Sequence, residues 1–191
     1  MDVNLDRVKS FKTPEEFCEW LGVNHAKEKE LWLKIFKKAS KIPSVNWEDA
    51  VIEAIAWGWI DGIKKSCDES AYFQRFTPRR KASGWSKRNC NHAENLIGAG
   101  RMQEAGLKLV DAAKADGRWQ AAYAGSAEME IPEDFLKALS ANKDAEAFFG
   151  TLNRANLFAI YHRLHNAKKP QTRQNRMEKI LGMLARGEKF Y

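Results

Sequence analysis

The residues with the greatest capacity for chemistry gather in one basic stretch that follows a predicted β-hairpin. Four arginines and two lysines lie around a tryptophan there, with hydroxyl and amide side chains between them, namely Arg75, Arg79, Arg80, Lys81, Lys87 and Arg88 around Trp85. A guanidinium group can bind a carboxylate or phosphate through two parallel hydrogen bonds, and an aromatic ring can stack on a planar group. We therefore predict a site for an anionic ligand, such as a phosphorylated molecule. Its predicted residues are Asp61, Arg75, Arg79, Arg80, Ser83, Trp85, Ser86 and Asn89.

A structural explanation of the same stretch stays open. Arg75 or Arg79 can pair with Asp61 inside the fold, and Trp85 can then belong to the core. Beside buried aromatic side chains, a carboxylate can also acquire a raised pKa and transfer protons, so an enzyme that uses Asp61 with Arg75 is an alternative. An aspartate in a turn or an ion pair is the commoner outcome. Because no partner at motif spacing supports catalysis, we predict no catalytic residue.

Two histidines, His162 and His165, are three residues apart in a predicted helix and can in principle share a metal ion. The sequence offers no obvious third ligand, and basic neighbours such as Arg163 and Lys168 would repel a cation. The phosphate-binding loop and the GxGxxG, GxSxG and HExxH motifs are absent from the sequence. We therefore predict neither a metal nor a cofactor.

The cysteines and the first residues of the chain indicate a location. Cys18, Cys67 and Cys90 are few, odd in number and widely separated, which is typical of reduced thiols rather than a disulfide framework. No apolar run approaches the roughly 20 residues of a membrane-spanning helix. The N-terminal residues are polar and mixed in charge, unlike a secretory signal. These features favour a cytoplasmic protein without a membrane span.

The net charge of +7 is unevenly distributed along the chain. Basic residues exceed acidic ones mainly within residues 151–191, and a second basic excess lies within residues 64–89. Basic clusters attract anions, acidic proteins or nucleic acid, although a solvated helix surface is the commoner explanation. Nucleic-acid binding through the C-terminal helices is therefore a further alternative. We expect Arg173, Arg176 and Lys179 to lie on a polar helix surface, where their removal leaves the fold intact.

The elements that must position the basic stretch have clear ends in the N-terminal part of the chain. Thr13, Pro14 and Glu16 start one helix with a capping box. Asn46 caps a second helix, and Gly58 stops it. Alternating apolar residues and a polar turn indicate strands that include a hairpin. The predicted elements are helices at residues 13–22 and 47–57 and strands at residues 30–37, 59–65 and 71–77.

From residue 86 onward the apolar spacing is helical almost to the end, with a short helical turn expected at residues 119–124. Residues 124–131 are the best candidate for a boundary. We therefore predict an α+β protein, with a small antiparallel sheet and packed helices in residues 1–124 and a helical part in residues 132–191. That the two parts form one compact unit is the alternative. The residues expected in the core include Trp47, Ile55 and Leu96.

A series of short motifs runs in order along the chain. It comprises residues 30–34 (ELWLK), 58–62 (GWIDG), 75–80 (RFTPRR), 83–89 (SGWSKRN), 100–102 (GRM), 116–119 (DGRW) and 169–173 (KPQTR). This series resembles the YdeI/OmpD-associated, bacteriocin-protection family over nearly the whole chain, and the run from Trp59 to Asn89 is its most specific part. The resemblance implies a bacterial protein linked to bacteriocin protection, to an outer-membrane porin and to stress survival. It supplies no catalytic residue or cofactor.

Together these features predict a non-enzymatic binding protein linked to stress or envelope protection. Its expected partner is an anionic small molecule or an acidic protein, held near the basic hairpin. A steep fall in binding with added salt would instead indicate nucleic acid. Turnover that the Asp61→Asn substitution abolishes in a folded protein would indicate the enzyme.

Overall fold

The structure is a computed structural model that describes residues 2–191, and it divides the chain into two compact units. The first unit runs to Trp85 and continues from Asn89 to Ala121. The second unit joins Ser86–Arg88 to Ala122–Tyr191, so the division falls just before the boundary expected at residues 124–131. None of the helices within residues 2–191 is both long enough and apolar enough to cross a membrane.

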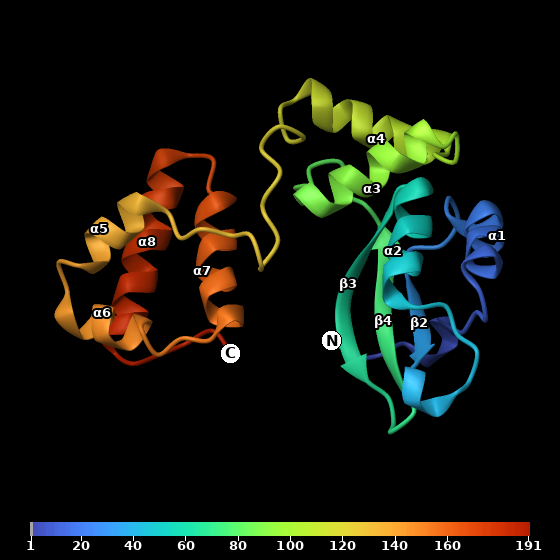
Figure 1. The fold of residues 1–191 in the computed structure, drawn as a ribbon. Coiled ribbons are helices and arrows are strands. Elements are labelled where there is room, and N and C mark those ends of the chain that lie inside the picture. The colour runs from blue at the N-terminus through green and yellow to red at the C-terminus, as the bar shows by residue number, and fades with distance from the viewer. Residues whose placement is uncertain (1) are drawn as a thin grey trace. The chain divides into compact units, whose positions relative to one another are not determined.

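Four strands and eight α-helices form within residues 2–191 (Figure 1). The strands are β1 (Val8–Lys9), β2 (Leu31–Phe36), β3 (Trp59–Ser66) and β4 (Ala71–Pro78). The helices are α1 (Pro14–Asn24), α2 (Trp47–Ala56), α3 (Lys87–Gly98), α4 (Glu104–Ala115), α5 (Glu133–Leu139), α6 (Lys143–Phe149), α7 (Arg154–His165) and α8 (Pro170–Ala185). The predicted α+β class is therefore confirmed.

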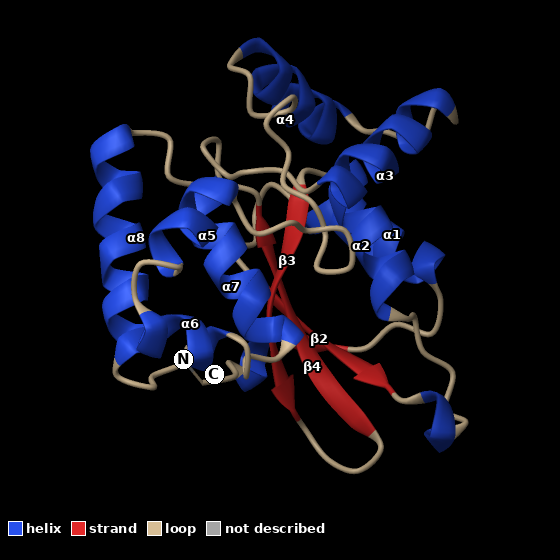
Figure 2. Ribbon diagram, turned by 60° about the vertical axis from the view of Figure 1, so that its left-hand side comes forward, coloured by secondary structure: helices blue, strands red, loops and turns tan. Residues whose placement is uncertain are grey.

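The strands form one mixed sheet in the order β1-β2-β4-β3 (Figure 2). β2 and β4 are antiparallel, and so are β4 and β3, which form the predicted hairpin. β1 pairs with β2 in parallel, so the expectation of a purely antiparallel sheet was wrong. The sequence did not reveal β1 because a strand of two residues is too short to show an alternating pattern.

The pairing register assigns each side chain of β4 to one face of the sheet, because side chains alternate along a strand. Gln74 and Phe76 lie on one face. Arg75, which pairs with Trp32, lies on the other. The Phe76 face is the one that α1 covers, since the rings of Phe17 and Phe76 are 5.6 Å apart.

α1 begins as the sequence predicted. The hydroxyl of Thr13 accepts a hydrogen bond from the Glu16 N–H at 3.3 Å, and the Glu16 carboxylate accepts one from the Lys12 N–H at 2.7 Å. These bonds satisfy backbone donors that the first helical turn leaves without partners. The helix continues two residues past the end expected at Gly22 and finishes at Asn24.

α2 also begins and ends where the sequence placed it. The side chain of Asn46 accepts a hydrogen bond from the Asp49 N–H at 3.0 Å. The helix stops before Gly58, which adopts a φ of 76° that other residues rarely adopt. Because Asn46 caps the helix, Trp47 is the first residue of α2. Its indole reaches Asp61 of β3 at the sheet and is not deep in the core.

The core predictions held for two of three residues. Ile55 and Leu96 are buried, as expected. Trp47 is only half-buried, so its assignment to the core was wrong. Its apolar character fits a helix face, but at the first position of α2 one side of the ring borders a cavity instead of other side chains.

The second unit contains α5, α6, α7 and α8. Its buried core joins all four helices through Phe135, Leu139, Ala145, Ile160, Leu164, Ile180 and Leu184. The sequence did not indicate α6, because Ala145 is the one residue of that helix that is buried and the apolar pattern is correspondingly weak. The helical turn expected at residues 119–124 is a non-helical turn in the structure.

Candidate functional site

The β3–β4 hairpin and the start of α2 border an open cavity of about 300 Å³. Its lining is polar and aromatic and consists of Trp47, Asp61, Gly62, Lys64, Tyr72 and Gln74. A bulge interrupts the register of β3 against β4, so that Asp61 pairs with Phe76 and Lys64 pairs with Gln74. Without this extra residue, Asp61 and Lys64 would point to opposite faces. The bulge therefore brings a carboxylate and an ammonium to the same cavity.

Trp47 holds the carboxylate of the cavity. Its indole Nε1 donates a hydrogen bond to Oδ2 of Asp61 at 3.1 Å. The indole belongs to the first turn of α2, and Asp61 lies in β3, so the bond also joins the helix to the hairpin. A carboxylate can accept about four hydrogen bonds, and the bond from Trp47 is one of those that Asp61 accepts.

Gln74 is the most deeply buried polar residue of the cavity, with 4 % of its surface exposed. Its Nε2 donates to the carbonyl oxygen of Gly62 at 2.9 Å. Its Oε1 accepts no hydrogen bond from any group of residues 2–191. Gln74 has no buried side-chain nitrogen or oxygen atom that lacks a hydrogen-bond partner, so solvent can satisfy this Oε1 and its position does not require a ligand.

Lys64 provides the positive charge of the cavity. Its Nζ lies 3.9 Å from the centre of the Tyr72 ring, a cation–π distance. Lys64 is exposed, and it forms no ion pair with a carboxylate of the described residues. Tyr72 is partly buried, and that burial raises the pKa of its phenol. The ammonium is therefore held in place by a ring while its charge stays available.

The cavity thus combines hydrogen-bond acceptors, one ammonium and two aromatic rings. Such a set can bind a small polar molecule, because a few well-placed polar groups fix the orientation of a ligand. It does not resemble a metal centre. Within residues 2–191, no group of three His, Cys, Asp or Glu side chains is placed to hold a metal ion.

Two other cavities have polar groups that already satisfy one another. In a cavity of about 410 Å³ beside Trp57, the charges of Glu104 and Lys108 pair at 2.6 Å. In a cavity of about 240 Å³ in the second unit, Asn156 accepts hydrogen bonds from the Phe190 and Tyr191 N–H groups at 2.9 and 3.2 Å. Lys189 also lines the cavity of the second unit, so a lysine beside a cavity is not confined to the hairpin, but the hairpin cavity adds the side chains of Asp61 and Gln74 to its lysine.

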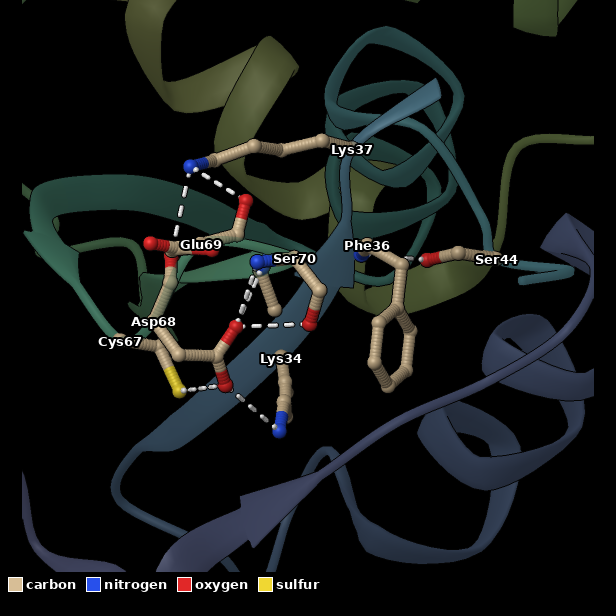
Figure 3. A network of polar contacts seen from close by, with 9 residues as sticks. Lys34, Phe36, Lys37, Ser44, Cys67, Asp68, Glu69 and Ser70 are labelled. Carbon is tan, nitrogen blue, oxygen red and sulfur yellow. Dashed lines mark hydrogen bonds and ion pairs between the residues drawn. The ribbon is translucent and has the colours of Figure 1, made fainter. Parts of the chain in front are cut away.

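The tip of the hairpin is fixed by Asp68 (Figure 3). Its Oδ1 accepts from the hydroxyl and the N–H of Ser70 at 2.6 and 2.7 Å. These bonds hold the pKa of the Asp68 carboxyl well below its usual range, and the bond from the Ser70 hydroxyl contributes most to this lowering. Lys37 donates to the carbonyl oxygens of Asp68 and Glu69, and Lys34 lies 3.4 Å from the Asp68 carboxylate. The tip is therefore tied to β2, which keeps the two strands of the cavity in register.

Arg75 does not reach the cavity. Its guanidinium pairs with Oε2 of Glu30, at 2.6 Å from Nη2 and 2.8 Å from Nε. Asp61 pairs with Phe76 in the register, so Asp61 and Arg75 point to opposite faces of the sheet. Of the two pairings with Asp61 that the sequence left open, the one with Arg75 is therefore not formed. The sequence could not indicate Glu30, because it lies 45 residues away and precedes β2.

Residues 79–85, here called the arginine loop, are packed into the first unit. Arg79 is 7 % exposed, and its Nη1 donates to the carbonyl oxygen of Gly84 at 2.8 Å. The guanidinium carbon lies 3.9 Å from the centre of the Trp85 ring, and Trp85 is 2 % exposed. The Trp85 ring in turn contacts the ring of Trp119 at 5.0 Å. Of the two explanations that the sequence left open for Trp85, the structure supports the core residue.

A second buried arginine secures this loop. Nη1 of Arg118 donates to the carbonyl oxygen of Ser83 at 2.9 Å, while its Nε contacts the Asp116 carboxylate at 2.8 Å. Ser83 thus contributes its backbone, and Arg80 is exposed on the loop. The buried Cys90 lies in α3, and burial raises the pKa of its thiol to about 11. Arg79, Trp85 and Arg118 are therefore buried and brace the loop, while Arg80, Lys81, Ala82 and Gly84 are exposed.

The predicted ligand residues are brought together only in part. Arg79, Ser83 and Trp85 share the arginine loop, while Asp61 lines the hairpin cavity. Asn89 lies in the first turn of α3. Ser86 belongs to the second unit, where it forms an isolated parallel bridge with Tyr123.

Arg173 and Arg176 are partly exposed residues of α8, and Lys179 is exposed, so the expected surface position holds. Arg173 makes two bonds to the Asp134 carboxylate, at 2.9 and 2.7 Å, and a third to the carbonyl oxygen of Leu164. Arg176 donates to the carbonyl oxygen of Arg163 at 2.6 Å. That their removal leaves the fold intact stays a prediction. Both arginines join α8 to its neighbours, a role that local charge cannot reveal.

The two histidines of α7 take part in an aromatic cluster. The rings of His162 and Tyr123 are 4.8 Å apart, and the rings of His165 and Tyr161 are 5.4 Å apart. Burial lowers the pKa of His162, with smaller contributions from nearby positive charge. The pair thus packs against tyrosines.

Sequence reasoning missed Trp47, Lys64, Tyr72 and Gln74 as residues of a shared site. Alternation along β4 gives Tyr72 and Gln74 one face, and that signal was available. The bulge that adds Lys64 to this face could not be predicted, because nothing in the sequence fixes the position of the bulge.

Comparisons with known proteins separate the same two parts of the chain. A family model described as a domain of unknown function, DUF8412, matches residues 9–109, and a model described as bacteriocin-protection, YdeI or OmpD-associated matches residues 128–187. No curated protein and no solved structure matches the chain. The expected resemblance is thus confirmed for a C-terminal segment, but its extent was overestimated, since Trp59 to Asn89 falls within the other match. The chain therefore belongs to the DUF8412 family through more than half of its length and carries a bacteriocin-protection, YdeI or OmpD-associated segment at residues 128–187.

Proposed function

We propose that this protein binds a small anionic molecule in the hairpin cavity and does not transform it chemically. The observation that carries the proposal is the ammonium of Lys64, which lines a cavity of about 300 Å³ and pairs with no carboxylate of residues 2–191. A lysine normally gains little from facing such a cavity alone. A carboxylate or phosphate there would form a charge-assisted hydrogen bond with it.

The arrangement of the other predicted residues supports binding at this place rather than at the arginine loop. Arg79 and Trp85 already contact each other and are nearly inaccessible to solvent. A ligand at the loop would have to displace this packing, whereas the hairpin cavity is open. The enzyme alternative loses its basis, because the faces of the sheet separate Asp61 from Arg75.

We also propose that this binding serves bacteriocin protection, in the cytoplasm. The support is the description of the family that residues 128–187 match. Nucleic-acid binding by α8 receives less support. Two of its basic side chains, Arg173 and Arg176, are engaged within the second unit.

Titration calorimetry of the full chain with inorganic phosphate and with acetate tests the proposal. We expect saturable binding that the Lys64→Gln substitution weakens by about tenfold or more. Lys65→Gln is the matched control, because Lys65 is exposed on the same strand but pairs with Phe73 on the opposite face. Equal losses in the two variants would reveal a general charge effect and overturn the proposed site. Absence of binding to both anions would overturn the function itself.

A further inference from the structure

We propose that α7 carries a binding site for an extended segment of another protein, in which an apolar residue precedes an aromatic one. Residues 189–191, here called the strap, occupy this site in the structure. The site and the strap both belong to the second unit, so the inference goes beyond the hairpin cavity and does not depend on it. Asn156 and Arg163 recognise the segment, and their spacing of seven residues places them on the same face of α7.

The amide of Asn156 recognises peptide backbone. Asn156 is 1 % exposed, and its Oδ1 accepts hydrogen bonds from the N–H groups of Phe190 and Tyr191 at 2.9 and 3.2 Å. Its Nδ2 donates to Oδ1 of Asn153, the cap of α7, at 2.9 Å, which orients the amide. Backbone N–H groups are common to nearly all residues, so these bonds can hold an extended segment of another sequence.

Arg163 adds a preference for an aromatic residue. Its guanidinium carbon lies 3.9 Å from the centre of the Phe190 ring, which also packs against the core of the second unit. Its Nη1 donates to the carbonyl oxygen of Ala159 at 3.1 Å, and this bond holds the planar group in place. A guanidinium is attracted to the face of a ring, so a segment with an aliphatic residue at this position would lose that contact.

The residue before the ring faces a cavity that the strap does not fill. The cavity has a volume of about 240 Å³, and Lys189 lines it together with the apolar side chains of Phe148 and Leu152. Lys189 is exposed, as expected for a side chain that keeps its charged end in water. An apolar side chain there would instead be buried against Phe148 and Leu152. The strap of a second copy offers the same lysine, so a different protein is the better occupant.

The strap is attached to the second unit at few points. Lys189 and Tyr191 are exposed, and Phe190 is only partly buried. Segments with few buried contacts open at a low free-energy cost. The strap therefore competes with a partner from within the chain and lowers the apparent affinity of that partner without blocking the site permanently.

Fluorescence polarisation with a labelled pentapeptide tests the proposal. The probe has the sequence of residues 187–191 with Lys189→Leu, and the protein is the full chain with Phe190→Ala, which removes the ring that anchors the strap. This chain should bind the probe at least about tenfold more tightly than the unaltered chain, because a tethered competitor acts at a roughly millimolar effective concentration. Tyr191→Ala, which removes a ring that is 72 % exposed, is the matched control and should not change the affinity. No binding by a folded Phe190→Ala chain at about 1 mM probe would overturn the site.

The sequence of the peptide tests what the site recognises. The peptide that retains Lys189 should bind at least about threefold more weakly than the probe. A probe that also carries Phe190→Ala should bind at least about tenfold more weakly. Equal binding of the three peptides would overturn the assigned class of partner.

A further variant separates recognition of the ring from support of the fold. Arg163→Gln is suited to this test, because Arg163 is only partly buried whereas Asn156 is fully buried. In the Phe190→Ala chain it should weaken binding of the probe about fivefold or more and leave binding of the peptide without the ring unchanged. An equal loss for both peptides would overturn the role of Arg163.

Size-exclusion chromatography with light scattering tests the choice of partner. The unaltered chain should show no dimer that depends on the strap. A dimer that Phe190→Ala converts to a monomer would overturn the different protein, because the occupant would then be the strap of a second copy.

Discussion

Two cation–aromatic pairs of the first unit have the same separation and opposite surroundings. The guanidinium of Arg79 and the ammonium of Lys64 each lie 3.9 Å from the centre of a ring, that of Trp85 and that of Tyr72. The first pair is buried and braced by the arginine loop, while the second borders an open cavity. The cation–π contact therefore stabilises the fold in the Arg79–Trp85 pair, whereas in the Lys64–Tyr72 pair it leaves the ammonium exposed at a cavity. Access to solvent, rather than residue type, decides between the two roles.

The largest expected difference concerns truncation of the two rings. Trp85→Ala should lower the free energy of unfolding by about 3–5 kcal/mol, because it removes a large buried ring that contacts Trp119. Tyr72→Ala should cost clearly less, since Tyr72 is only partly buried. Urea unfolding followed by circular dichroism measures both. Equal losses would contradict the contrast between a core ring and a cavity ring.

A smaller effect is expected from exchanging the cations. Arg79→Lys keeps the charge but loses the planar fork that donates to the Gly84 carbonyl and stacks on Trp85, so it should cost about 2 kcal/mol. Lys64→Arg should leave the stability nearly unchanged, because Lys64 is exposed. The same urea titration tests the pair of variants. An Arg79→Lys protein with an unchanged free energy of unfolding would show that the positive charge alone stabilises the loop.

The difference between these pairs explains what could be predicted from the sequence. Caps and alternation are local, so the starts of α1 and α2 and the hairpin strands were predictable from Thr13, Asn46 and the residues that follow them. The basic loop was recognised as chemically notable for the same reason. Its burial was not predictable, because it depends on Trp119 and Arg118, which lie more than thirty residues away in the sequence.

The hairpin cavity was unpredictable for a different reason. Asp61 was among the candidate residues, but its neighbours in space are set by the bulge and by Trp47. Gln74 looked like an ordinary polar residue of a strand, and only its burial distinguishes it. Local sequence thus identifies elements, whereas a site depends on register and on contacts across elements.

Thiol reactivity provides an independent measure of the same contrast. Burial raises the pKa of the Cys90 thiol to about 11, and Cys67 at the hairpin tip also has a raised pKa, from burial first and then from its bond to Asp68. The thiolate is the reactive form, so both thiols should react faster as the pH rises. At pH 8, iodoacetamide should modify the more accessible Cys67 at least about tenfold faster than Cys90.

Mass spectrometry of peptides after timed labelling measures both rates in one sample. Labelling in urea is the control, because unfolding should make the two rates similar. Equal rates in the native protein would mean that α3 opens readily, and the loop could not then be regarded as part of a rigid core.

The smallest expected effect decides the status of the hairpin cavity. Lys64→Gln removes an exposed cation–π contact, which contributes at most about 1 kcal/mol at such a position. Lys65→Gln, on the same strand and on the opposite face, should change the unfolding free energy by less than about 0.5 kcal/mol. The two variants should therefore differ little in urea and strongly in ligand binding. If Lys64→Gln instead destabilised the protein by several kcal/mol, the ammonium would be holding the hairpin together as Arg79 holds its loop. A charge needed for folding would leave no reason to assign it a ligand, and the contrast between the two pairs would disappear.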